Sequence, residues 1–548
     1  MKALLLIIQS SYHNSVKATI AITFIAIILF ISSIIYVFKF SQHNPKRKPL
    51  VRRLPPGPKP WPLLGCLPAM LWNKNSPTHL WIHEIMKQFN TEIACIRLGS
   101  NTHIIPVTSP ELALEFLKTH DVVFGSRPIS MTAEILSRGY LSTVLSPMGD
   151  QWRKMRRILV SQVLNPSTLH GMLGQRTKEA DTLLRYIFIL TRNGEAIDIR
   201  SITRHYCGNI SRRMMFNRRY YGKGREDGGP TFEEEDHTQA LFTILRHVHA
   251  FSISDFIPFL KPLDLDGHGK ILKDALNSIQ RYDDPIIEER VQQWKDGKKK
   301  KKVEVDDILD ILLSLKDENG KSLLSIHEIK AQIIELQIAT IDNPSNAVEW
   351  TMAELLNQQK FLQKAIEELD EVVGRERLVQ ESDIPKLKYL TACVRESFRL
   401  HPYSSFNVPH VSNSDIVVAG YFIPKGSQVL LSRLGLGRNP RIWEDPLRFD
   451  PERHLKDGTV ELGISEPNLR FITFTRGRRG CIGTSLGTNI TMMLFARLLQ
   501  GFSWSLLPGI TKIDFSETHG LSLSKPLHLH AKPRLSHNMY QILIDHQP

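Results

Sequence analysis

One cysteine, Cys481, stands in a segment whose neighbours favour its ionised form. It lies in the run FTRGRRGCIG at residues 474–483. A free cysteine has a pKa of roughly 8.5, and only the thiolate binds a metal ion. Gly480 and Gly483 allow backbone N–H groups to approach the sulfur without a Cβ clash. The segment therefore predicts metal ligation by Cys481; the alternative is a basic glycine-rich turn that happens to contain a cysteine.

Two further features near Cys481 favour the thiolate. An apolar pattern of helical period runs from Thr484 to Gln500 and closes at Gly501, a residue typical of helix ends. The sulfur is thus expected at a helix N-terminus, where the helix dipole stabilises an anion. Three arginines are close in sequence, namely Arg476, Arg478 and Arg479. The other four cysteines are widely spaced and predict buried, reduced thiols: Cys66, Cys95, Cys207 and Cys393.

The longest predicted helix spans residues 325–356 and contains a proline. Ser325 and Glu328 form a capping-box pattern, and apolar residues recur with helical period on both sides of Pro344. A proline inside a helix removes one hydrogen bond and clashes with the preceding turn, at a cost of about 3 kcal/mol or more. We expect a kink at Pro344; the alternative is that the helix ends at Asn343.

Other segments predict simpler elements. Residues 93–107 alternate in polarity around a Gly-Ser-Asn turn and predict a β-hairpin. Residues 222–237 are rich in glycine and acidic residues and predict a surface loop, and the lysine run Lys298–Lys302 predicts another exposed loop. Glu396 and Arg399 are spaced i, i+3, so they share a helix face and can pair.

The segment around Cys481 resembles the haem loop of cytochrome P-450 enzymes. The pattern Phe-x-x-Gly-x-Arg-x-Cys-x-Gly is matched by Phe474, Gly477, Arg479, Cys481 and Gly483. The resemblance implies that Cys481 is the axial thiolate ligand of a haem b iron. It also implies that Phe474 shields the sulfur and that Arg479 pairs with a haem propionate.

Further matches extend this resemblance along the chain. Trp152 and Arg156 resemble the pair that holds a propionate, and His410 is expected to contact one too. Glu396 and Arg399 resemble the superfamily's Glu-x-x-Arg, which Arg453 would complete as a buried cluster. The resemblance implies a mainly α fold with a small β domain, the haem-thiolate cytochrome P-450 fold.

Three segments resemble one branch of this superfamily, the plant amino-acid N-monooxygenases. They are Asp342-Asn-Pro-Ser-Asn346, Phe406-Asn-Val-Pro-His410 and Pro451-Glu-Arg-His454. The resemblance implies two N-hydroxylations of an L-amino acid, aromatic or branched-chain, then dehydration and decarboxylation to an aldoxime in plant nitrogen-containing defence metabolism. Gly483 stands where alanine is common in the branch. Two alternatives remain: a carbon hydroxylase of an apolar metabolite, and an NADPH-independent haem-thiolate lyase.

Roles within the implied reaction fall on three pairs of residues. Asp342 and Asn343 are the catalytic candidates, because they stand where the superfamily usually carries an acid and an alcohol over the oxygen site. An asparagine amide can hydrogen-bond water but relays protons poorly. Arg127 and Arg138 are candidate partners of the substrate carboxylate, because a guanidinium binds a carboxylate bidentately. Phe406 and Asn407 are expected to line the pocket.

The N-terminal segments predict a membrane anchor. Residues 18–38 are uncharged and apolar, long enough for one transmembrane helix, with residues 1–17 in the lumen. Basic residues follow, so residues 39–65 predict a basic, proline-rich hinge and residues 66–548 a cytosolic domain of a single-pass protein. The anchor and hinge resemble those of microsomal cytochrome P-450 enzymes, which implies the endoplasmic reticulum membrane. The alternative is a cleaved signal peptide.

The partners follow from charge and from a missing motif. The net charge of +14 allows an acidic protein, anionic lipid or nucleic acid, but no nucleic-acid motif is present. No Gly-x-Gly-x-x-Gly follows a predicted strand, so NADPH is expected to bind elsewhere. The resemblance implies electrons from NADPH through a separate flavoprotein reductase, with O2 and an L-amino acid as substrates.

Overall fold

The computed structural model describes residues 53–73, 77–248, 250–297, 307–455, 463–518 and 520–545. The predicted lumenal segment, the transmembrane segment 18–38, residues 39–52 of the predicted hinge and the lysine run Lys298–Lys302 lie outside these ranges. Within the described ranges, no helix has the length and apolar character needed to cross a membrane.

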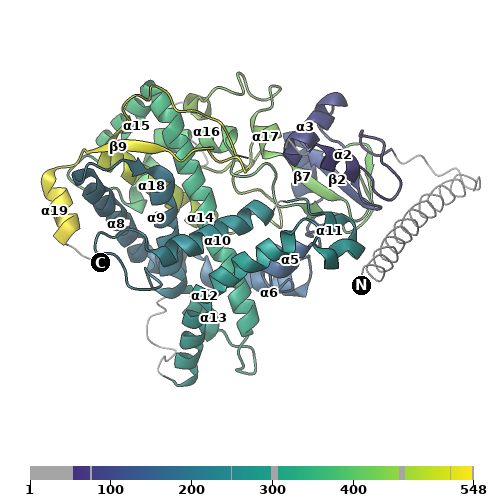
Figure 1. The fold of residues 1–548 in the computed structure, drawn as a ribbon, viewed down its shortest axis with the longest axis horizontal. Helices are drawn as coiled ribbons and strands as arrows, with labels where there is room; N and C mark the ends of the chain where they lie inside the picture. Colours follow the sequence, from purple (N-terminus) through teal and green to yellow (C-terminus); the bar gives the residue numbers. More distant parts are fainter. Residues whose placement is uncertain are drawn as a thin grey trace, which may run out of the picture.

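Helices make up most of the described chain, and short strands form three small sheets (Figure 1). The helices are α2 (Leu67–Trp72), α3 (Thr78–Gln88), α4 (Pro110–Leu114), η1 (Glu115–Thr119), α5 (Met131–Leu136), α6 (Asp150–Ile158), η2 (Leu159–Val163), α7 (Pro166–Gly171), α8 (Leu173–Arg192), α9 (Ile199–Phe216), α10 (Phe232–Val248), α11 (Ile253–Phe256), η3 (Pro258–Leu263), α12 (His268–Lys295), α13 (Ile308–Ser314), α14 (Ile326–Asn357), α15 (Gln359–Val372), η4 (Glu381–Lys386), α16 (Lys388–Leu400), α17 (Arg433–Gly437), η5 (Pro451–His454), α18 (Thr484–Gly501) and α19 (His537–Asp545). The strands are β1 (Ile96–Leu98), β2 (Thr102–Val107), β3 (Ile197–Asp198), β4 (His410–Val411), β5 (Ile416–Val418), β6 (Tyr421–Ile423), β7 (Gln428–Leu431), β8 (Phe502–Leu506) and β9 (His528–Pro533).

Helix α14 runs through the middle of the helical part and packs against α9, α10, α16 and α18 (Figure 1). Its start is the predicted capping box, in which Ser325 accepts from the Glu328 N–H and Glu328 accepts from the Ser325 N–H. The helix continues through Pro344 to Asn357, so the alternative of an end at Asn343 is wrong. The kink at Pro344 stays a prediction. Packing of α14 against α9, α10, α16 and α18 compensates for the backbone hydrogen bond that Pro344 removes from the helix.

The larger sheet has the strand order β1-β2-β7-β4 and lies beside α2 and α3 (Figure 1). The predicted hairpin is confirmed: β1 pairs antiparallel with β2, with Ile96 opposite Ile104. Strand β7 pairs parallel with β2, with Gln428 opposite Ile104, and antiparallel with β4. Because β4 begins at His410, this sheet places His410 beside the core of the molecule.

One predicted loop differs from the structure over part of its length. Helix α10 begins at Phe232, so the predicted loop 222–237 is wrong over its last residues. Its acidic residues Glu233–Glu235 occupy the first turn of the helix, where the dipole stabilises negative charge.

Residues 53–65 of the predicted hinge hydrogen-bond to the domain: the Arg53 carbonyl accepts from the Phe422 N–H, and the Pro56 carbonyl from the Cys95 N–H.

A buried carboxylate, Glu396, joins α16 to η5. Arg399 donates to both Glu396 oxygens at 2.7 Å, and Arg453 donates from Nε at 3.0 Å. His454 Nε2 lies 2.8 Å from the second oxygen, a contact that the sequence did not predict. Burial alone would raise the pKa of Glu396, but the hydrogen bonds from Arg399 and His454 lower it to about 2. The expected Glu396–Arg399–Arg453 arrangement is therefore present, with His454 as a fourth member.

Replacing Glu396 by glutamine is expected to lower the free energy of unfolding by about 3–5 kcal/mol, because it leaves buried guanidinium groups without a counter-charge. Urea unfolding of Glu396→Gln and of the exposed control Glu367→Gln measures this. The stabilisation from Glu396 is present above about pH 4.5 and is lost as the pH falls toward 2, because its folded pKa is depressed. Equal stability of the two variants would contradict this.

Candidate active site

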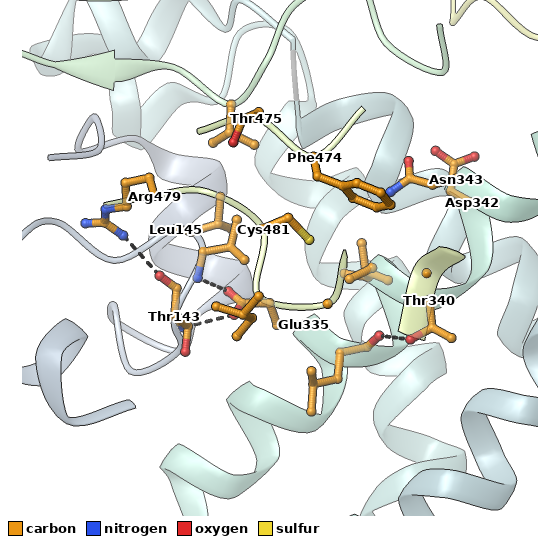
Figure 2. A pocket seen from close by; sticks show the side chains of 18 of the residues that line it. Thr143, Leu145, Glu335, Thr340, Asp342, Asn343, Phe474, Thr475, Arg479 and Cys481 are labelled. Carbon is orange, nitrogen blue, oxygen red and sulfur yellow. Dashed lines mark hydrogen bonds between the residues drawn. The ribbon is translucent and has the colours of Figure 1, made fainter. Parts of the chain in front are cut away.

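A cavity of about 320 Å³ lies between α14 and the segment around Cys481. Loop residues 142–145, α6, the segment 403–410 and the start of α18 complete its wall. Figure 2 shows the Cys481 sulfur and the Asn343 amide pointing toward the same space from opposite sides. The cavity thus joins the predicted thiolate ligand with the two predicted catalytic residues.

The segment 474–483 is a tight turn that ends at the N-terminus of α18. The Cys481 N–H donates to the Phe474 carbonyl, and the Gly480 N–H donates to the Gly477 carbonyl, both at 2.9 Å. Gly477 has a φ of +79°, and a Cβ there would lie 2.1 Å from the Leu117 carbonyl oxygen. Helix α18 begins at Thr484, as predicted. The turn therefore needs glycine at position 477 in order to pack against η1.

The charges that favour the Cys481 thiolate come from other residues than the sequence indicated. Burial raises the pKa of the Cys481 thiol, and the Gly483 N–H, Arg156 and Arg433 oppose that rise. The three arginines nearest in sequence bind elsewhere: Arg476 donates to the Pro467 carbonyl, Arg478 lies 3.5 Å from Asp121, and Arg479 donates to the carbonyls of Gly125, Thr143 and Ser146. The residues around the sulfur that oppose the effect of burial are therefore Arg156 and Arg433, not the arginines adjacent in sequence.

The described lining of the cavity carries more positive than negative side chains. Its guanidinium groups are Arg127, Arg156, Arg433 and Arg479, and its carboxylates are Glu335 and Asp342. Burial and, to a smaller extent, repulsion from Arg156 together lower the pKa of Arg479 to about 9. Mutually repelling buried cations favour an anionic occupant. The indole Nε1 of Trp152 is buried without a hydrogen-bond partner and offers such an occupant a donor.

Arg479 and His410 both line the cavity and are held by backbone carbonyls. The Arg479 guanidinium also lies over the Trp152 ring, at 4.3 Å from its centroid. His410 Nδ1 lies 2.8 Å from the Phe124 carbonyl oxygen, which can only accept, so Nδ1 donates and Nε2 is the acceptor-capable nitrogen. Burial, followed by repulsion from Arg127, holds the pKa of His410 well below its ordinary value. His410 is therefore neutral at physiological pH.

Glu335 of α14 is a cavity residue that sequence reasoning missed. It accepts from the Ser142 hydroxyl at 2.6 Å and from the N–H groups of Thr143 and Val144 at 2.9 and 2.8 Å (Figure 2). These bonds fasten the loop 142–144 to α14, and Thr143 in turn accepts from Arg479. A charged residue between Ile334 and Leu336 in an apolar stretch was the only sequence signal.

The catalytic candidates occupy one turn of α14. Burial raises the pKa of Asp342 to about 6, and the charge of Arg204 on α9 opposes that rise. Thr340, the alcohol two residues before Asp342, donates to the Leu336 carbonyl of its own helix at 2.7 Å. Asp342 and Asn343 both line the cavity. The helix therefore presents an acid and an amide, not an acid and a free alcohol.

The structure separates the four substrate candidates. Phe406, Asn407 and Arg127 line the cavity, whereas Arg138 is absent from the described lining and lies 3.8 Å from Asp284 of α12. Arg127 donates to the carbonyls of Val144, Val408 and Pro409, so it also joins two loops of the wall. The side-chain oxygen Oδ1 of Asn407 accepts from the Leu431 N–H, and the buried side-chain nitrogen Nδ2 has no hydrogen-bond partner.

All five cysteines lie in the described ranges and none forms a disulfide. Cys66, Cys95, Cys207 and Cys393 are buried, as predicted, while the Cys481 side chain is accessible and lines the cavity. Burial raises the pKa of Cys207 and Cys393, so these thiols stay protonated. Cys481 is the cysteine available to a ligand.

Comparison with known proteins identifies the class. The family model for cytochrome P450 matches residues 55–531, and this chain belongs to that family. A tryptophan N-monooxygenase of Prunus mume is 53% identical over 94% of this chain and 96% of its own length. An isoleucine N-monooxygenase of Lotus japonicus is 53% identical over 95% and 96%, and a phenylalanine N-monooxygenase of Arabidopsis thaliana is 52% identical over 89% and 92%.

The cavity fits the haem that this family implies. Cys481 supplies a sulfur that faces the cavity, and the cationic wall matches the two negative charges of haem propionates. Trp152 Nε1 and Arg156 are donors in the lining that can serve such groups, whereas the predicted propionate contact of His410 is not supported, because its one N–H donates to the Phe124 carbonyl. Phe474 packs against α18, because a Cβ at Gly487 would lie 3.3 Å from its ring. Cys481 would thus hold the iron, with Phe474 at its side.

Substituting Gly477 by alanine is expected to reduce haem retention several-fold, because the positive φ and the Leu117 carbonyl both exclude a side chain; left-handed strain alone costs about 1–3 kcal/mol. Haem per protein, measured from absorbance after purification, checks this. Gly483→Ala is the matched control, since a Cβ there meets only the Cys481 sulfur, at 3.8 Å. Equal haem loss in both variants would rule out the close approach at Gly477 as the cause.

Proposed function

We propose that this chain is a haem-thiolate N-monooxygenase that converts an L-amino acid to its aldoxime. The observation that carries the proposal is the pairing of Cys481 with Asp342 and Asn343 across one cavity. Three relatives that are 52–53% identical to this chain and are named N-monooxygenases support it. The reaction is two successive hydroxylations of the α-amine, followed by loss of water and carbon dioxide.

Bound haem supplies the oxygen chemistry, because electron density from an axial thiolate favours cleavage of the O–O bond. The residues of the chain supply protons and position. Asp342 has a pKa near 6, so it accepts and releases protons close to neutral pH. The Asn343 amide donates and accepts hydrogen bonds but does not ionise, so it orients water beside Asp342. This arrangement leaves room for the substrate's own amine and carboxylate in the hydrogen-bonded chain.

An amino-acid substrate requires a partner for its carboxylate inside the cavity. Arg127 is the candidate that remains after Arg138, because its guanidinium is buried and lines the cavity. The unpartnered Nδ2 of Asn407 adds a donor on the same wall. Phe406 covers the neighbouring surface and stacks on His83, with ring centroids 5.8 Å apart. Arg127 and Asn407 would bind the carboxylate of the substrate, and Phe406 would contact its side chain.

Two other functions are distinguished by their chemistry. A carbon hydroxylase of an apolar metabolite needs no cation to bind its substrate, whereas the proposed amino-acid substrate needs one, and Arg127 lines the cavity. A haem-thiolate lyase rearranges a hydroperoxide without NADPH and needs no electron partner. We therefore include in the proposal a separate NADPH-dependent flavoprotein reductase and O2 as co-substrate.

A membrane location, at the endoplasmic reticulum with the described domain in the cytosol, is part of the proposal. Exposed apolar side chains gather on two segments that pack on the same small core as the β1–β2 hairpin. Trp72 at the end of α2 is 78% exposed and Phe259 of η3 is 79% exposed. Other exposed apolar residues on these segments are Trp61, Leu63, Leu71, Leu263 and Leu265. Aromatic side chains of this kind favour the interface of a bilayer. The apolar stretch 18–38 would provide the anchor next to this surface.

Microsomes that contain this chain, a flavoprotein reductase and NADPH are expected to form an aldoxime from at least one protein amino acid. Each amino acid is supplied singly and products are identified by mass spectrometry, because relatives named for tryptophan, isoleucine and phenylalanine are similarly identical. Cys481→Ala microsomes are the control. Aldoxime absent from every incubation would refute the proposal, and turnover of a hydroperoxide without NADPH would favour the lyase.

The aldoxime-forming rate is expected to fall as the pH drops through about 6, because protonated Asp342 no longer accepts a proton. Asp342→Asn should lose this inflection and at least tenfold in rate. The pKa of Asp342 in the folded protein lies above its ordinary value, so the ionised carboxylate destabilises the fold at neutral pH. Asp342→Asn should therefore melt at a higher temperature than the parent at pH 7.

Asn343→Thr is the companion variant for this test. It should form less aldoxime per NADPH consumed, because a hydroxyl relays protons that the amide does not. An unchanged ratio would contradict the water-orienting role of Asn343, and an unchanged inflection in Asp342→Asn would contradict the role of Asp342.

A further inference from the structure

Two histidine rings face each other where three helices meet beside the cavity. His247, at the end of α10, and His268, at the start of α12, have their Nδ1 atoms 3.2 Å apart. Their ring centroids are 5.1 Å apart and the rings are tilted by 55°. His268 Nε2 lies 2.6 Å from the hydroxyl of Thr132 on α5. The contact therefore links α5, α10 and α12.

The hydrogen bonds prepare His268 to use Nδ1 as a ligand. When Nε2–H donates to the Thr132 hydroxyl, the lone pair of the ring lies on Nδ1 and points toward His247. Metal-binding histidines in proteins generally donate their other nitrogen to such a partner, which fixes the tautomer. His247 needs only to move its proton from Nδ1 to Nε2. Neither ring then has to lose a proton to the solvent.

The spacing of the two nitrogens matches a tetrahedral ion. Zinc binds histidine nitrogen at about 2.0–2.1 Å, which places two nitrogens of one tetrahedron roughly 3.3–3.4 Å apart. The observed 3.2 Å requires almost no movement. Within the described residues no group of three or more His, Cys, Asp and Glu side chains gathers around one point. Water would therefore fill the remaining positions.

We propose that His247 and His268 form a two-histidine site for a zinc-type divalent cation that bridges α10 and α12. The site itself does not depend on the amino-acid N-monooxygenase function, whereas its effect on kcat/KM rests on that proposed function. The charges around the pair are mixed. Asp266 accepts from the backbone N–H of His268, and its negative charge attracts a cation, as does that of Asp264. The positive charge of Arg246 opposes them.

The surroundings of both rings disfavour their charged form. Burial lowers the pKa of His247, and Arg246 adds to this effect. Burial and the neighbouring His247 lower the pKa of His268.

A bridged pair would restrict the wall of the cavity. Leu245 and Val248 on α10 and Leu136 on α5 line the cavity, and they lie close in sequence to His247 and Thr132. Fixing α10 to α12 holds these apolar side chains in place and slows exchange of a substrate past them. Bound cation is thus expected to lower kcat/KM for the amino acid by reducing the rate of substrate entry.

Calorimetric titration of the untagged, full-length holoenzyme with zinc chloride tests the site without any turnover. One saturable site is expected, and His247→Ala should weaken it at least tenfold. His247 is chosen because it is only part-buried, so the variant should fold. Thr132→Val should weaken binding about 10–100-fold by removing the partner of Nε2. The exposed His170→Ala is the control and should bind as the parent does.

Binding that is absent, or equally strong in His247→Ala and the parent, would overturn the site. The functional part is tested by kcat/KM with and without zinc: a decrease of several-fold in the parent and none in His247→Ala supports it. Inhibition that persists in His247→Ala would overturn the link between the site and the cavity. Because calorimetry needs no substrate, failure of the proposed enzyme activity would leave the binding result readable.

Discussion

The wall of the cavity depends on buried guanidinium groups that bind backbone carbonyls. Arg479 donates to three carbonyls between residues 125 and 146, and Arg127 donates to Val144, Val408 and Pro409. A buried cation is tolerated only where its donors are satisfied. These bonds therefore fix the loop before α6, the strand region at β4 and the cysteine turn relative to one another. The same positive charge then selects an anionic occupant for the space between them.

Helix α14 links this charged wall to the reaction centre. At Glu335 it holds the loop 142–144, and two turns later it presents Asp342 and Asn343 to the cavity. Pro344 follows directly and is accommodated because α9, α10, α16 and α18 pack around the helix. The helix thus combines a structural carboxylate, hydrogen-bonded and fixed, with a second carboxylate whose pKa of about 6 leaves it able to exchange protons. Environment, not residue type, separates the two roles.

Local patterns in the sequence predicted much of this architecture. The capping box at Ser325, the hairpin 93–107 and the start of α18 depend on residues a few positions apart, and all are confirmed. The Glu396–Arg399 pair was predictable for the same reason, since one helical turn joins its members. The start of α10 was not: its acidic first turn has the composition of a loop, and its apolar packing against α12 decides the outcome.

The sequence by itself indicated the candidate residues for the proposed chemistry, because the Cys481 turn and the Asp342-Asn343 pair are each encoded within ten residues. Tertiary structure alone decided what surrounds them. Arg156 and Arg433, distant in sequence, supply the charge near Cys481, while the adjacent arginines bind other partners. Arg138 points to α12 instead of the cavity, and His247 meets His268 only where α10 and α12 pack. The reason is physical: electrostatic interactions act through space over a few ångströms, and only the fold sets those distances.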